Sequence, residues 1–363
     1  MKILMTTDSV GGVWSYSMEL CKALGSLDEC EVVLACMGGR LGTAEREEAL
    51  GLPNVELHEA GYRLEWMENP WSDVEQAAHW VESLLQDSRA DLLHLNCYGP
   101  AIRDYDVPVL LTVHSCVHSW WRATRGSEPD PSWKRYRDCV IRALYSASRV
   151  IAPTAATLDA TLACYEEVNL SGRAQVIYNG IDPADWTASR TPSARFIFGV
   201  GRVWDEAKNL RQLAAVAPYL NCPVLIAGDG ELDRHVPGVL LLGAQSRSRL
   251  VPYYRRAAIF AHPARYEPFG LAVLEAALCG CPLVLGDIPS LRELWDGVAA
   301  FADPDDAQAW RETLARLLDR PAERRSRGSA ARARALRYGG KNMAAAYAAQ
   351  YRRLLELPAE NVA

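Results

Sequence analysis

Two carboxylates eight residues apart, Glu267 and Glu275, stand in the most distinctive stretch of the chain, residues 264–287. Both could accept hydrogen bonds from hydroxyl groups. Pro268 fixes its own φ and disfavours a helical conformation at the residue before it, so Glu267 is predicted to lie in a loop. A helix is predicted over residues 269–278 because glycine and proline follow it, which places Glu275 within that helix.

The N-terminus of this predicted helix is a candidate phosphate-binding site. Gly270 and Leu271 would present free backbone N–H groups there, at the end that carries about half a positive charge. A phosphate held between two carboxylates suits a ligand with both a diphosphate and a sugar part. The alternative is a buried helix in which Glu275 only pairs with an arginine.

Two cations flank a predicted loop earlier in the second half of the chain. A strand predicted over residues 196–200 leads into Gly201 and Arg202, and Lys208 is expected to open the next helix, residues 210–219. Arginine and lysine around such a loop suit diphosphate oxygens. Surface cations are common, so these two residues alone are equally compatible with an ordinary solvent-exposed loop.

The first half opens with a strand predicted over residues 2–7, a glycine turn and an amphipathic helix. Gly11, Gly12 and Val13 lie where the strand ends, and doubly wound α/β folds bind ligands at that edge of the sheet. A plain tight turn is the alternative. Because Gly-x-Gly-x-x-Gly is absent, a nicotinamide dehydrogenase is excluded.

Polar and aromatic side chains follow another strand of this half, predicted over residues 108–114. His114 stands at its end and is a candidate functional residue, whereas His94, inside a strand, is expected to be structural. The pair Trp120 and Trp121 could stack against a ring or pack in a core.

Strands and helices alternate along the whole chain, which predicts two doubly wound α/β domains with parallel sheets. The turn-rich residues 178–183 are interpreted as a hinge. We therefore expect one domain over residues 1–180, a second over 181–340 and a final segment, 341–363, whose helix covers about 342–357. The carboxyl edges of the two sheets are expected to face one another across a cleft.

Composition narrows the classes of partner. The 363 residues carry a net charge of −6, and the acidic excess falls in the first half, which disfavours nucleic acid and anionic membranes. Membrane association is expected to be weak and peripheral at most. Ten scattered cysteines without a Cys-x2-Cys pair, and no signal-peptide core, predict a cytoplasmic protein with buried thiols. The arginine-rich residues 320–337 are interpreted as a solvated helix face, with membrane or RNA contact as the alternative.

The stretch Arg-Tyr-Glu-Pro-Phe-Gly-Leu-x-x-Leu-Glu-Ala from Arg265, followed by Gly-x-Pro, resembles the signature of family 4 retaining glycosyltransferases, which have the GT-B fold. Four further motifs fall in the order of that family, so the resemblance covers nearly the whole chain. They are Gly11-Gly12-Val13, Asn179-Gly180-Ile181-Asp182, Gly201-Arg202 with Lys208-Asn209, and Ala227-Gly228-Asp229-Gly230.

This resemblance implies a role for each matched position. Glu275 would bind the ribose of a nucleotide, and Arg202 and Lys208 would hold its diphosphate. The donor sugar would be bound by Glu267 and by the backbone of three residues, Phe269, Gly270 and Leu271. Gly11, Gly12 and Val13 would let the acceptor domain approach the diphosphate, and His114 would lie over the sugar. The last helix would cross back onto the N-terminal domain.

The expected reaction moves a sugar from a nucleotide-diphosphate sugar to the hydroxyl group of a glycan, a lipid-linked acceptor or a small molecule, with retention of configuration. Fixed cations and a helix N-terminus would stabilise the departing diphosphate, so neither a cofactor nor a metal is expected. Asp104-Tyr-Asp106 and Asp303-Pro-Asp305 are not assigned a metal. UDP, GDP, ADP and dTDP donors are all compatible. A glycoside phosphorylase, a sugar-nucleotide epimerase and a non-catalytic binder are the alternatives.

Overall fold

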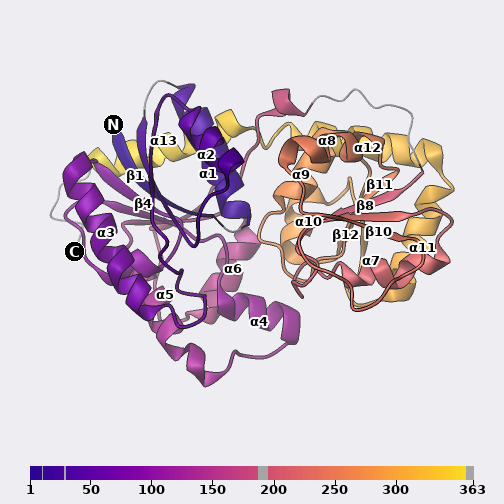
Figure 1. Cartoon of the computed structure of the whole chain (residues 1–363), viewed down its shortest axis with the longest axis horizontal. Helices are drawn as coiled ribbons and strands as arrows, with labels where there is room; N and C mark the ends of the chain where they lie inside the picture. Colours follow the sequence, from indigo (N-terminus) through magenta and orange to yellow (C-terminus); the bar gives the residue numbers. More distant parts are fainter. Residues whose placement is uncertain (10, 28–29, 187–194, 357–363) are drawn as a thin grey trace. The chain divides into compact units, whose positions relative to one another are not determined.

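A computed structural model describes residues 1–9, 11–27, 30–186 and 195–356, and the chain forms two compact units. The first unit contains residues 1–121 and 127–180 together with the C-terminal segment from Gly340. The second contains residues 181–339 and the short segment Arg122–Gly126. Each unit is a parallel sheet covered by helices, the doubly wound α/β architecture that the sequence predicts (Figure 1).

The sheet of the first unit has seven parallel strands in the order β3-β2-β1-β4-β5-β6-β7. Their bounds are β1 (Lys2–Asp8), β2 (Glu31–Met37), β3 (Val55–Glu59), β4 (Leu92–Leu95), β5 (Val109–Thr112), β6 (Arg149–Ala152) and β7 (Ala174–Val176). The helices are α1 (Gly12–Gly25), α2 (Thr43–Leu50), α3 (Trp71–Ser88), α4 (Val117–Arg125), α5 (Lys134–Ser146), α6 (Ala155–Cys164) and α13 (Gly340–Glu356). The last four residues of α4, 122–125, belong to the segment assigned to the second unit. The central strands β4 and β5 are fully buried, which explains why they read as continuous apolar runs.

The last helix, α13, packs against α1 and is tied to the sheet by a buried polar network. His94, with no exposed surface, lies between two hydroxyl groups: its Nδ1 is 2.8 Å from Tyr351 Oη and its Nε2 is 2.8 Å from Thr112 Oγ1. His94 is therefore structural, as expected from its place inside a strand. Leu357, the predicted end of this helix, and the residues after it lie outside the described residues.

The sheet of the second unit has six parallel strands in the order β10-β9-β8-β11-β12-β13. Their bounds are β8 (Ile197–Val200), β9 (Val224–Ala227), β10 (Val239–Gly243), β11 (Ile259–His262), β12 (Leu283–Gly286) and β13 (Ala300–Ala302). The helices are α7 (Arg211–Val216), α8 (Arg247–Arg256), α9 (Leu271–Leu278), α10 (Pro289–Trp295), α11 (Ala307–Leu318) and α12 (Pro321–Ala335). Separate apolar cores form on the two faces of the sheet, one under α8, α9 and α12 and the other under α7 and α11 (Figure 1).

Three details differ from the expectations drawn from the sequence. Lys208 does not open a helix, because α7 begins at Arg211 and the N–H of Lys208 donates to the carbonyl oxygen of Asp205 in a turn. Helices α2 and α4 and strand β13 were not expected. In α2 only Ala49 is buried, so this helix lacks the apolar stripe that would have revealed it.

Candidate functional site

Two glycine turns meet at the carboxyl edge of the second sheet. A Cβ at Gly228 would lie 1.8 Å from the carbonyl oxygen of Gly201, so the turn after β9 packs directly on the turn after β8. The N–H of Val203 donates to the carbonyl oxygen of Asp229 at 2.8 Å, which joins the same two turns. The loop that carries Arg202 is therefore fixed by its neighbour.

Arg202 is oriented by a buried carboxylate. Its Nε and Nη2 donate to Oδ2 of Asp205 at 3.2 and 2.6 Å, and Asp205 is only 5% exposed. The guanidinium also lies 5.1 Å from the ring centroid of Trp204. Since a guanidinium has five N–H donors, Arg202 keeps donors for an anion at this edge.

Lys208 and Glu267 form a close ion pair, with Nζ 2.6 Å from Oε2. His262, at the end of β11, places its Nε2 2.8 Å from the same oxygen. Burial raises the pKa of Glu267, but the ammonium of Lys208 and the hydrogen bond from His262 outweigh burial and hold the pKa well below its usual range. Glu267 is therefore ionised at neutral pH.

Helix α9 begins at Leu271, after Gly270 in the left-handed conformation with φ +87°. The free N–H groups of its first turn therefore follow Glu267 within a few residues, as the sequence predicts. The ring of Phe269 is buried and meets Tyr338 edge-on at 5.8 Å. Phe269 therefore offers a ligand its backbone, while its ring belongs to the core.

Glu275 is held by two donors within the same unit. Its Oε1 accepts from Nε of Arg247 and its Oε2 from the hydroxyl of Tyr254, each at 2.9 Å. The arginine pairing considered as the alternative for this residue is thus present. A carboxylate has about four acceptor positions and can therefore accept from several donors at once.

The first unit has its own cluster at the carboxyl edge of its sheet. Gly11, with φ +88°, precedes α1, which begins at Gly12 and continues through Val13. His114 follows β5, and its Nε2 lies 2.8 Å from Oδ1 of Asn96.

The protonation state of His114 follows from its surroundings. Because Nδ2 of Asn96 donates to the carbonyl oxygen of Thr6, Oδ1 of Asn96 must be an acceptor and Nε2 of His114 must carry a hydrogen. Burial lowers the pKa of His114 to about 3. The imidazole is therefore neutral, with Nδ1 as a hydrogen-bond acceptor.

Trp120 and Trp121 both lie in α4, with ring centroids 6.2 Å apart at 69°. Each is partly exposed, an arrangement compatible with stacking as well as with packing.

The structure identifies the residues that orient the predicted ones; of these, sequence analysis had placed only Asn96, at the carboxyl edge beside His114. They are Asp205 for Arg202, His262 for Glu267, Arg247 and Tyr254 for Glu275, and Asn96 for His114. Asp205 stands three residues after Arg202, which is a readable signal. Each of the other four partners lies on a different element from the residue it orients, so no spacing identifies these pairs.

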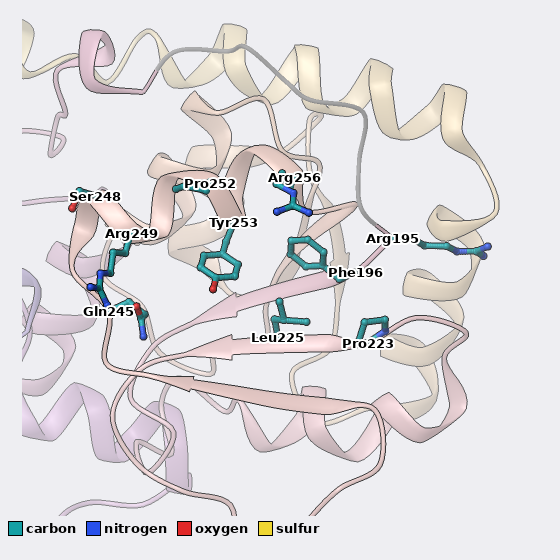
Figure 2. Close-up of a pocket in the computed structure, with 10 residues that line it drawn as sticks. All are labelled: Arg195, Phe196, Pro223, Leu225, Gln245, Ser248, Arg249, Pro252, Tyr253 and Arg256. Atoms are coloured by element: carbon teal, nitrogen blue, oxygen red, sulfur yellow. The ribbon is translucent and has the colours of Figure 1, made fainter.

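A cavity of about 730 Å³ lies elsewhere on the second unit, between α8 and strands β8 and β9. Figure 2 shows Tyr253 pointing from α8 towards Leu225, with Arg249 and Arg256 on either side along the helix. None of the residues predicted to bind a donor lines this cavity. The candidate site is therefore the cluster at the sheet edge and not this cavity.

Among the described helices, none combines the length and the apolar composition that a membrane-spanning segment requires. In the same part of the chain, no group of three or more His, Cys, Asp or Glu side chains could hold a metal ion.

Fold and site together define a protein of two Rossmann-like units, with a candidate site for phosphate and hydroxyl groups at the sheet edge of the second. Comparison with protein families gives the same class. Residues 10–185 match the model for Glycosyltransferase Family 4, and residues 194–320 match the model for Glycosyl transferases group 1. Together the two models cover most of the chain, which belongs to the family 4 glycosyltransferases.

Curated relatives share moderate identity. A D-inositol 3-phosphate glycosyltransferase of Mycolicibacterium smegmatis is 32% identical over 189 residues, 44% of this chain and 43% of the relative. A glycogen synthase of Mycobacterium tuberculosis is 29% identical over 282 residues, 68% of this chain and 64% of the relative. The matches thus span less than two thirds of the length of either relative.

Solved structures to which this chain is similar have the GT-B fold. Sucrose-phosphate synthase of Thermosynechococcus elongatus matches with a TM-score of 0.81 at 18% identity, covering 98% of this chain and 99% of that one. Anabaena HepE, solved in complex with UDP and glucose, matches with a TM-score of 0.74 at 19% identity, covering 97% and 100%. At these identities the likeness establishes the fold.

Proposed function

We propose that the protein is a retaining glycosyltransferase that takes a sugar from a nucleotide-diphosphate sugar and transfers it to a hydroxyl acceptor without a metal ion. The observation that carries the proposal is the ion pair between Lys208 and Glu267, 2.6 Å apart, just before the helix that contains Glu275. The cation and the helix N-terminus suit the phosphates of such a donor, and the two carboxylates suit the hydroxyls of its sugar and its ribose.

In this proposal the diphosphate lies against Arg202, Lys208 and the first turn of α9. When the bond to the sugar breaks, negative charge develops on the leaving phosphate. Arg202, already held by Asp205, needs little reorganisation to stabilise that charge, and Lys208 reaches it by turning from Glu267. Glu275 accepts from the ribose hydroxyls and Glu267 from the sugar.

Glu267 acts here as a sugar-binding group and not as a covalent nucleophile. Its Oε2 accepts a hydrogen bond from the buried His262, which reduces its nucleophilicity. We propose that a phosphate oxygen of the donor assists deprotonation of the acceptor, as in front-face attack. A glycosyl-enzyme adduct should then not be trappable.

The first unit is proposed to bind the acceptor through Gly11, Gly12 and Val13 and the neutral imidazole of His114. Trp120 and Trp121 are proposed to contact a ring of that acceptor. Replacement of either tryptophan by alanine should raise the acceptor KM in a folded protein, and an unchanged KM in both variants would remove them from the site.

The test is release of nucleoside diphosphate from UDP-, GDP-, ADP- and dTDP-sugars in the presence of EDTA and candidate hydroxyl acceptors. Activity with one donor class should be lost in Glu275→Ala and Lys208→Ala and kept in Arg256→Ala, whose exposed side chain lies on the separate cavity. Proton NMR of the product should show the anomeric configuration of the donor. Strict dependence on inorganic phosphate, or turnover without an acceptor, would favour a phosphorylase or an epimerase instead.

A further inference from the structure

His262 is a deeply buried polar residue that contacts the candidate site. It ends strand β11, is 1% exposed, and its ring stacks on Phe260 with a centroid distance of 6.2 Å. Its Nε2 is 2.8 Å from Oε2 of Glu267. Because an ionised carboxylate only accepts hydrogen bonds, Nε2 of His262 must be the donor.

The two oxygens of Glu267 are used unequally. Oε2 accepts from both His262 and Lys208, whereas Oε1 accepts no hydrogen bond within residues 1–9, 11–27, 30–186 and 195–356. The carbonyl oxygen of the same residue accepts from the hydroxyl of Ser290. Glu267 is therefore held at its backbone and at one carboxylate oxygen, and the other oxygen remains for a ligand.

Lys208 and His262 differ in how firmly they can hold this carboxylate. Lys208 is a flexible side chain, 21% exposed, whose ammonium has two further donors. A diphosphate at this edge would draw that ammonium towards itself. His262 sits in a packed strand end and has no such freedom, so its bond to Oε2 persists when Lys208 turns to phosphate.

We infer that His262 is a positioning residue that fixes Glu267 so that Oε1 faces the hydroxyls of the donor sugar. This inference rests on the proposed function. It separates two parts of the site: Glu275, held by Arg247 and Tyr254, serves the nucleoside, and Glu267, held by His262, serves the sugar. Loss of His262 should weaken binding of the sugar part alone.

The experiment compares binding of a nucleotide sugar with binding of its own nucleoside diphosphate by isothermal titration calorimetry in EDTA. The probe pairs are UDP-glucose and UDP, ADP-glucose and ADP, GDP-mannose and GDP, and dTDP-glucose and dTDP. Three variants are measured. His262→Leu removes the donor, His262→Gln places an amide nitrogen near the position of Nε2, and His262→Asn keeps the polarity with a nitrogen that falls short of Glu267.

We expect His262→Leu and His262→Asn to raise the Kd of the nucleotide sugar about tenfold and to change the Kd of the nucleoside diphosphate less than twofold. In His262→Gln, the Kd of each ligand should stay within about threefold of the wild-type value. The inference would be overturned if the affinity for both ligands fell equally in all three variants, or if it fell for neither ligand in any folded variant. If the wild-type protein binds no pair, the proposed function itself fails and the role of His262 falls with it. Thermal unfolding of each variant shows that the comparison is made on folded protein.

Discussion

Arg332 donates from Nη1 to the backbone carbonyl oxygen of Leu278, the last residue of α9. The same nitrogen donates to the carbonyl oxygen of Trp186 at 3.1 Å. The final carbonyl groups of a helix have no partners within the helix and carry partial negative charge, so a guanidinium stabilises them. Helix α9 thus has its C-terminus secured by a cation and its N-terminus at the candidate phosphate site.

Arg332→Ala is predicted to lower the free energy of unfolding by about 1–3 kcal/mol, because it leaves buried carbonyl groups without a donor. Urea unfolding followed by circular dichroism measures this. The matched control is Arg325→Ala in the same helix, which is exposed and whose side chain makes no hydrogen bond in the described chain. It should change stability by less than about 0.5 kcal/mol. Equal effects of the two replacements would contradict the capping role.

Two other arginines of α12 do the same for neighbouring helices. Arg324 donates to the carbonyl oxygens of Leu317 and Leu318 at the end of α11, and Arg334 donates to that of Leu294 in the last turn of α10. The expectation of a solvated arginine face holds for Arg325 and Arg337, which are exposed, and is wrong for Arg324, Arg332 and Arg334. Composition alone could not separate these two groups, since the carbonyl partners belong to other helices.

Stability should fall on mild acidification because two histidines are neutral in the folded state. Burial lowers the pKa of His94 and of His114 to about 3, from an ordinary value of 6.5. The unfolded chain binds protons at these residues as the pH falls below about 6.5, whereas the folded protein does not, so the associated stability is lost progressively between pH 6.5 and 3. Each residue contributes roughly 1 kcal/mol per pH unit between pH 6 and 5.

The measurement is the free energy of unfolding at several pH values for the wild-type protein, His94→Gln and His114→Gln. Between pH 6 and 5, the free energy of unfolding of each variant should fall less steeply than that of the wild type, by roughly 1 kcal/mol per pH unit. An unchanged slope for both variants would mean that these histidines titrate normally.

Glu267 should contribute a second, more acidic transition. Its folded pKa is held below the ordinary value of 4.5, so the stability it contributes is present above about pH 4.5 and is lost as the pH falls towards the folded pKa. In Lys208→Met the pKa of Glu267 should rise, and the loss of stability between pH 5 and 3 should be smaller. Lys134→Met, which breaks an exposed pair with Asp138, is the control and should follow the wild-type curve.

Gly228 is predicted to tolerate no side chain. A Cβ there would overlap the carbonyl oxygen of Gly201, so Gly228→Ala should cost about 3–5 kcal/mol and displace the loop of Arg202. Gly297 also has a positive φ, +80°, but nothing lies within 4 Å of its Cβ position. Gly297→Ala should therefore cost about 1 kcal/mol, from backbone strain alone. Chemical denaturation of both variants tests the difference, and similar costs would exclude the clash.

The sequence predicted most of the fold because buried strands are continuous apolar runs. Strands such as Leu92–Leu95 and Ile259–His262 stand out between glycine- and proline-rich turns. The carboxylate–helix arrangement around Glu267 was predictable for the same local reason, since Pro268 and Gly270 dictate a loop and a helix start. His262 was not, because its function depends on where a strand end lies relative to a loop, and it reads as one more residue of an apolar strand.

Thermal unfolding of the protein in EDTA, with and without UDP-, GDP-, ADP- and dTDP-sugars, shows whether the protein binds a nucleotide sugar without a metal ion. A ligand at 100 times its Kd should add about 2.7 kcal/mol of stability. We expect a clear rise in Tm with one donor class, lost in Glu275→Ala and Lys208→Ala and retained in Arg256→Ala. An unchanged Tm with every nucleotide sugar would contradict binding of a nucleotide-sugar donor, and sugar phosphates would then be the next ligands to test.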